Sequence, residues 1–201
     1  MSWVWREKEE LLNAMELLEH SVTSEDALIL IKKIEKETRA EFGVDPRKFF
    51  SKSDVVQRLI NIGKQYASDE KALEKVIAAL VTISERCDIK PQNIYDFLFD
   101  YIDSPNKKIK MSVANALPFF PQFNSYEKKW EYILSIPKLT PKRDSMDVFR
   151  WVIQYKIADV PHELKSTIID IFKNVLKKRD QDLDIFHSVH LFEDLIERLS
   201  K

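Results

Sequence analysis

Apolar residues recur along almost the whole chain at spacings of three and four positions. This spacing places them on one face of an α-helix, because each residue advances a helix by about 100 degrees. Three clear stripes are Leu73, Val76, Ile77, Leu80 and Ile83; Leu164, Ile168, Ile171, Phe172 and Val175; and Ile185, Val189, Phe192, Ile196 and Leu199. No comparable segment alternates with the period of two typical of a β-strand. The pattern predicts an all-α fold.

Capping residues and prolines divide the chain into about ten helices. Side-chain oxygens can accept N–H groups of a first helical turn, and a first-turn proline loses no hydrogen bond. The capping candidates include Thr23 or Ser24, Ser53, Ser68, Ser104 and Asn124, the last forming a capping-box pattern with Glu127. Gly43 and Asp45-Pro46 predict a connecting segment rather than a helix. The predicted helices span 3–20, 24–41, 53–66, 69–86, 91–102, 105–117, 125–135, 141–157, 161–178 and 182–199.

The helices carry a weak internal repeat. The segments KVIAALVTI (75–83) and SVANALPFF (112–120) share Val-x-x-Ala-Leu, and their leucines, Leu80 and Leu117, lie 37 positions apart. Val152 follows after 35 positions and Val189 after another 37. Helices paired at such a period favour stacked hairpins, each of which needs a neighbour to bury its apolar face.

The segment around Leu117 resembles the second half of a HEAT repeat. The matching positions are Asp103, Ser104, Pro105, Asn106, Ile109, Lys110, Val113, Ala116 and Leu117. Lys110 stands where the family usually has arginine, and Pro118 where it usually has glycine. By period the resemblance covers residues 68–201. It implies a right-handed α–α superhelix, a HEAT/ARM-like solenoid, and a binding role more than a catalytic one.

We expect one helical-repeat domain over residues 1–201. Residues 51–201 would form the HEAT-like hairpins. Residues 1–50 fit the period less well, and we interpret them as atypical N-terminal capping helices, since the end of a solenoid must present a polar outer face. A separate small domain over residues 1–50 is the alternative.

Composition excludes several classes of site. The chain has two glycines, Gly43 and Gly63, and they are far apart, so the common glycine-rich phosphate loops are absent. Cys87 is the only cysteine, which leaves no intrachain disulfide and no thiolate zinc site. The charged start of the chain does not resemble a signal peptide, and no apolar run approaches the roughly 20 residues of a membrane span. We therefore expect a cytoplasmic protein without cofactors.

Charge is distributed unevenly along the sequence. Residues 104–156 contain ten basic and four acidic residues, a net charge of +6, while the whole chain carries -1. Helices of a solenoid lie side by side, so this segment predicts a basic surface. The candidate partner-binding residues are Lys107, Lys110, Lys128, Lys129, Arg143, Arg150 and Trp151. Solvated helix faces that bind nothing are the alternative.

Aromatic residues interleave with these cations. Val148, Trp151 and Tyr155 fall on the face of their helix opposite Phe149 and Ile153. Such a helix either packs between two neighbours or exposes Trp151 as an anchor for a partner, because tryptophan and arginine are frequent interface hot spots. Base stacking beside phosphate contacts would use the same residue types.

Evidence for chemistry at a site is thin. His187, His190 and Asp194 share a helical edge, but no second segment supplies ligands, so we predict no metal site. Cys87 lies near Glu85 and Asp88, which would raise a thiol pKa. No nucleophile, base and orienting group occur together, and we predict no enzyme activity.

The sequence therefore favours a noncatalytic helical-repeat module that binds a protein with an acidic surface, as a scaffold or as an inhibitor or immunity-type binder. The alternative is a nucleic-acid-binding protein resembling the HEAT-like DNA alkylation-repeat proteins. Its weakness is the nearly neutral total charge, because phosphate-binding domains are usually strongly basic.

Overall fold

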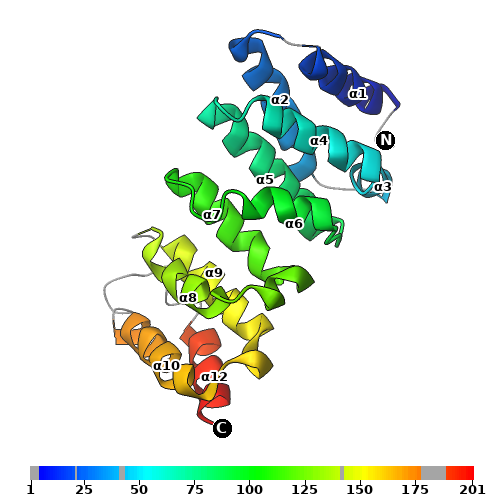
Figure 1. Ribbon diagram of the computed structural model, residues 1–201. Helices are drawn as coiled ribbons and strands as arrows, with labels where there is room; N and C mark the ends of the chain where they lie inside the picture. Colours follow the sequence, from blue (N-terminus) through cyan, green and yellow to red (C-terminus); the bar gives the residue numbers. More distant parts are fainter. Residues whose placement is uncertain (1–4, 21, 41–43, 141–142, 178–188) are drawn as a thin grey trace. The chain divides into compact units, whose positions relative to one another are not determined.

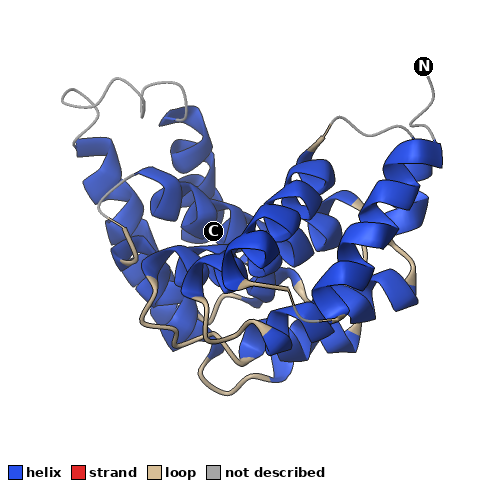
Figure 2. Ribbon diagram, turned by 90° about the horizontal axis from the view of Figure 1, so that it is seen from above, coloured by secondary structure: helices blue, strands red, loops and turns tan. Residues whose placement is uncertain are grey.

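All regular elements in the described part of the protein are helices. The computed structural model describes residues 5–20, 22–40, 44–140, 143–177 and 189–201, and the side chains at 5–7, 44–45 and 143 lie outside the description. Eleven α-helices and four short 3₁₀ helices occur within these ranges, with no strand among them (Figure 2). The predicted all-α class is confirmed. No helix in these ranges is both long and apolar enough to cross a membrane.

The chain separates into two compact units, Met1–Asn124 and Ser125–Lys201. The first contains α1 (Trp5–Glu19), α2 (Ser24–Arg39), α3 (Val44–Phe50), α4 (Ser53–Gln65), α5 (Glu70–Arg86), α6 (Gln92–Phe99), α7 (Lys107–Ala116) and η1 (Leu117–Phe119). The short helix η2 (Pro121–Ser125) ends at the start of the second unit. The expectation of a single domain stays a prediction.

Helices of the first unit form two rows. In one row α1 contacts α4 and α4 contacts α6; in the other α2 contacts α5 and α5 contacts α7 (Figure 1). Between the rows α1 contacts α2, α4 contacts α5, and α5 contacts α6. Helices consecutive along the chain thus alternate between the rows, except for the short α3, which contacts α4 and α5.

Equivalent helices of one row begin in the same way. The side chain of Asp69 accepts hydrogen bonds from the backbone N–H groups of Lys71 (3.0 Å) and Ala72 (3.1 Å) at the start of α5. Asn106, 37 positions later, accepts the corresponding bonds from Lys108 (3.0 Å) and Ile109 (3.3 Å) at the start of α7. These two caps, rather than Ser68 and Ser104, begin the helices, and their spacing equals that of Leu80 and Leu117.

The core of the first unit lies between the rows. Leu80 and Leu117 are both fully buried, as are Val76 and Val113. Ile109 and Ala116 are buried while Lys107 is exposed, so α7 turns the side that carries Ile109, Val113 and Ala116 to the core. The single described glycine, Gly63, lies in α4 where the ring of Phe97 and the side chain of Val76 approach its backbone.

The second unit is smaller and built around aromatic rings. It contains α8 (Lys129–Ser135), η3 (Ile136–Lys138), α9 (Arg143–Tyr155), η4 (Ile157–Asp159), α10 (His162–Lys177) and α12 (Val189–Ser200). Phe149 of α9 packs on Phe172 of α10, and Phe172 on Phe192 of α12, each pair with ring centroids 5.4 Å apart. The side of α9 that carries Phe149 therefore packs in this core, and the opposite side of the helix does not.

Several predicted boundaries were wrong. Residues 44–50 form α3, where a connection was expected. Asn124 does not cap a helix, because it lies within η2, and α8 begins only at Lys129. After α7 the chain continues as a 3₁₀ helix over Leu117–Phe119, because Pro118 has no backbone N–H with which to extend the α-helix. Part of the helix predicted over 182–199 falls outside the described residues, and α12 accounts for the rest.

Candidate functional site

The lysines predicted in the first unit lie on α7, where two other residues, Lys108 and Asn115, contact carboxylates of α5. Lys107 is exposed and Lys110 is half-buried, both near the start of α7. Lys108 Nζ lies 3.4 Å from Glu74 of α5, and Asn115 donates a hydrogen bond of 2.8 Å to Glu85. Acidic side chains of α5 therefore partly neutralise the surface next to α7.

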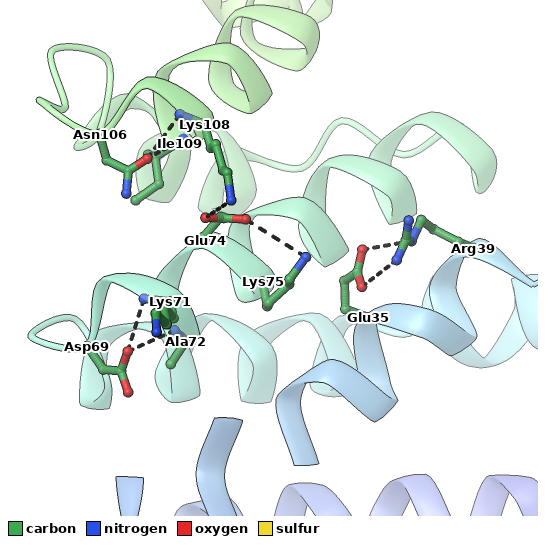
Figure 3. Close-up of polar contacts among 10 residues, drawn as sticks. All are labelled: Glu35, Arg39, Asp69, Lys71, Ala72, Glu74, Lys75, Asn106, Lys108 and Ile109. Atoms are coloured by element: carbon green, nitrogen blue, oxygen red, sulfur yellow. Dashed lines mark hydrogen bonds and ion pairs between the residues drawn. The ribbon is translucent and has the colours of Figure 1, made fainter. Parts of the chain in front are cut away.

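Figure 3 shows that Glu74 lies between two lysines, Lys108 of α7 and Lys75 of its own helix. In the same view, Glu35 and Arg39 of α2 form an ion pair of 2.7 Å, and the Glu35 side chain is almost fully buried. These contacts join neighbouring turns and helices of one row. They explain several charges as parts of the fold rather than as ligands of a partner.

The predicted residues of the second unit occupy different environments. Lys128 is exposed just before α8, and Lys129, the first residue of α8, is half-buried. Arg143 begins α9, but its side chain lies outside the described part of the structure. Trp151 is one of the most exposed large apolar residues of the described chain.

Arg150 is not displayed on the surface as the sequence analysis assumed. Only 7% of it is exposed. Its Nη1 donates a hydrogen bond of 3.3 Å to Gln154 Oε1, its Nε lies 3.9 Å from Asp147 Oδ1, and its guanidinium lies over the Trp151 ring, 5.8 Å from the centroid. A buried charged group is stabilised by polar neighbours such as Asp147 and Gln154. The Arg150 guanidinium therefore packs over the Trp151 ring.

One face of α9 is left open. Trp151 is 59% exposed and Tyr155, one turn later, is 61% exposed. At about 100 degrees per residue, the positions of α9 on this face with Trp151 at its centre are Asp144, Asp147, Val148, Gln154 and Tyr155, and all are exposed or half-exposed. We call these six residues the α9 face. Trp151 is therefore exposed rather than packed between neighbouring helices, and its role as an anchor for a partner stays a prediction.

Lys156 lies behind the α9 face. It is only 3% exposed, and its Nζ lies 5.4 Å from the centroid of the Tyr155 ring. Burial lowers the pKa of Lys156, Asp159 opposes the shift, and the like charge of Lys129 adds to it. Arg150, which lies over the Trp151 ring, and Lys156, which lies over the Tyr155 ring, are thus both buried.

The buried Lys156 gives a prediction about pH. Its native pKa lies below the ordinary value of 10.5 that it has when unfolded. At a pH between the native and the unfolded pKa of Lys156, the unfolded state binds more protons than the native state. The contribution of Lys156 to stability therefore rises with pH through this range. The cost of burying its charge is fully present only below the native pKa. The free energy of unfolding of the protein minus that of Lys156→Met should therefore increase from pH 7 to pH 10.5. Urea titrations at several pH values measure it.

The exposed Lys128 provides the control for this measurement. Lys128→Met removes the same charge from an exposed position, and its difference should change less over this range than that of Lys156→Met. Equal changes for the two variants would contradict the lowered pKa of Lys156.

Other candidates do not assemble. His190 and Asp194 lie on α12, His187 falls outside the described residues, and no group of three metal-ligating side chains occurs within the described ranges. Cys87 is half-buried, its Sγ donates to the Arg47 carbonyl at 3.7 Å, and burial raises its pKa. A raised thiol pKa lowers the fraction of reactive thiolate.

Sequence reasoning missed part of the α9 face. The candidate residues did not include Tyr155, Asp144 or Asp147. The spacing of Trp151 and Tyr155 already placed these two aromatic residues on one side of the helix. Comparisons with protein-family models, with curated proteins and with solved structures gave no match. The fold and this surface define an all-α protein with about eleven helices and an open aromatic helix face.

Proposed function

We propose that the protein is a noncatalytic helical-repeat module that binds another protein, and that the α9 face takes part in the contact. The observation that carries this proposal is the exposure of Trp151 and Tyr155 one helical turn apart. Large aromatic side chains concentrate binding energy at interfaces, because they bury much area and lose little conformational freedom. A scaffold, an inhibitor or an immunity-type binder would use such a surface.

The repeat architecture belongs to the same proposal. Two rows of helices in the first unit and equivalent caps 37 residues apart support a HEAT/ARM-like solenoid, a right-handed α–α superhelix. The resemblance of residues 103–118 to a HEAT repeat supports it as well. Stacked repeats provide extended surfaces that bind macromolecules, which fits a binding role.

Nucleic-acid binding remains the alternative function. The lysines at 107, 110, 128 and 129 favour it, and stacked bases could use Trp151. Against it, Arg150 and Lys156 are buried next to the aromatic pair, and Asp144 and Asp147 share its face. Carboxylates beside the stacking surface would repel a phosphate backbone.

A titration with labelled duplex and single-stranded DNA separates the two functions. We expect no complex tighter than the roughly 10⁻⁴ to 10⁻⁶ M of nonspecific binding at near-physiological salt. Charge reversal at the exposed lysines, Lys107→Glu with Lys128→Glu, should remove only weak binding that is already sensitive to salt. A submicromolar complex that weakens steeply with salt and is lost in this variant would make nucleic-acid binding the better function.

The protein-binding function has its own measurement. A protein that copurifies with the chain should be lost with Trp151→Ser and retained with Ile29→Ser. Ile29, on α2 of the first unit, is 60% exposed and so matches Trp151 in exposure. Equal retention by both variants would remove the α9 face from the contact.

A further inference from the structure

The α9 face has an uneven distribution of chemistry along its length. Its N-terminal part carries the carboxylates of Asp144 and Asp147, and its C-terminal part carries the rings of Trp151 and Tyr155. Val148 is apolar, and Gln154 is neutral. The described side chains on this face thus include two acids and no base, although the face lies within the most basic segment of the sequence.

Arg150 lies beside this face rather than on it. It is 7% exposed, and its Nε, 3.9 Å from Asp147 Oδ1, offsets part of the charge of that carboxylate, while Asp144 is exposed at the end of the face. The contacts of Arg150 with Gln154 and with the Trp151 ring fix two members of the face one turn apart. A side chain held in place before binding loses less entropy when a partner arrives.

From this distribution of charge and apolar surface, we propose that the α9 face binds a cationic amphipathic helix of a partner protein. Apolar residues of that helix would pack on Trp151 and Tyr155, and its lysines or arginines would lie beside Asp144 and Asp147. The inference rests on the proposed protein-binding function and specifies the partner class. It replaces, for this face, the acidic partner expected from the charge of the sequence.

Length and geometry fit a short helix. The distance along α9 from Asp144 to Tyr155 is about 16 Å, at about 1.5 Å per residue, which corresponds to about three helical turns of a partner lying alongside. Anchors at i, i+3, i+4 and i+7 of an amphipathic helix span about 10 Å, which fits within this length. An arginine of the partner can also stack on the Trp151 ring, since cations are attracted to the face of an indole.

The charge preference can be tested with two synthetic peptides. Both form a helix with leucines along one face; one carries lysines beside this face and the other carries glutamates at the same positions. Fluorescence anisotropy of the labelled peptides with the full chain should show the lysine peptide binding at least about tenfold more tightly, a difference of about 1.4 kcal/mol. Trp151→Ser should weaken its binding at least about tenfold, and Ile29→Ser should leave it unchanged.

Reversing one charge on the α9 face gives the sharpest outcome. Asp144→Lys should weaken the lysine peptide and strengthen the glutamate peptide, because it exchanges the sign of the face at its exposed end. Asp170→Lys, an exposed aspartate on α10, makes the same change of net charge elsewhere and should have little effect on either peptide.

Several results would overturn the partner class. They are no binding of the lysine peptide, equal binding of both peptides, and equal effects of Asp144→Lys and Asp170→Lys. The proposed function fails differently, through tight nucleic-acid binding at near-physiological salt. A chain that binds neither peptide nor DNA would reject the cationic helix and leave protein binding to be tested by copurification.

Discussion

Replacing Leu117 by aspartate should lower the free energy of unfolding by about 4 kcal/mol or more. Leu117 is fully buried at the end of α7. Removal of a buried leucine side chain costs about 2–5 kcal/mol, and an unpaired carboxylate in the same place adds the cost of its desolvation. Because whole domains are stable by about 5–15 kcal/mol, this variant should approach unfolding at ambient temperature.

Neighbouring substitutions show whether the effect comes from burial. Ala116→Asp should also be strongly destabilising, since Ala116 is 2% exposed. Lys107→Ala and Lys110→Ala should change stability by about 0.5 kcal/mol or less, because one is exposed and the other half-exposed. Urea denaturation of the four variants gives the comparison. Equal midpoints would mean that α7 presents a different face to the core.

The sequence predicted helices well because their apolar stripes reflect which residues are buried. The stripe through Val76 and Leu80 becomes the buried side of α5. Helix ends were harder, since several polar residues near a start can serve as the cap, and Asp69 and Asn106 were preferred over the neighbouring serines. α3 was missed because Asp45-Pro46 resembles a turn, although proline is tolerated in the first turn of a helix.

The candidate site was less predictable for a physical reason. Sequence spacing places residues on a face of a helix, but it does not say which neighbours cover that face. Trp151 and Phe149 have similar apolar character, yet one is 59% exposed and the other fully buried. Arg150 was taken as a surface cation, whereas its side chain lies along α9 with Asp147 and Gln154 as neighbours. Charge counted along a segment therefore does not show which of its cations are exposed.

Gly63→Ala should destabilise the first unit, although alanine normally favours a helix. A Cβ at this position would lie 2.6 Å from Phe97 Cζ and 3.0 Å from Val76 Cγ1. The Phe97 ring is 2% exposed and packs edge-on against the Tyr101 ring, 5.3 Å between centroids, which leaves it little space to move. Overpacking costs about 1–3 kcal/mol, against about 1 kcal/mol gained in helix propensity. Gly63→Val should cost more, because its additional methyl groups enter the same space.

A double-mutant cycle with Phe97→Leu identifies the cause. Leucine lacks the distal ring atom closest to the new Cβ, so Gly63→Ala should cost less in the Phe97→Leu background than alone, a coupling of about 1 kcal/mol. Lys64→Ala, on the exposed side of α4, serves as the control and should change stability by less than about 0.5 kcal/mol. Additive costs would show that the glycine is needed for another reason. A smaller cost of Gly63→Ala in the Phe97→Leu background would show that Gly63 lets α6 approach α4 closely. The absence of a side chain at this position then allows the two helices to pack within one row.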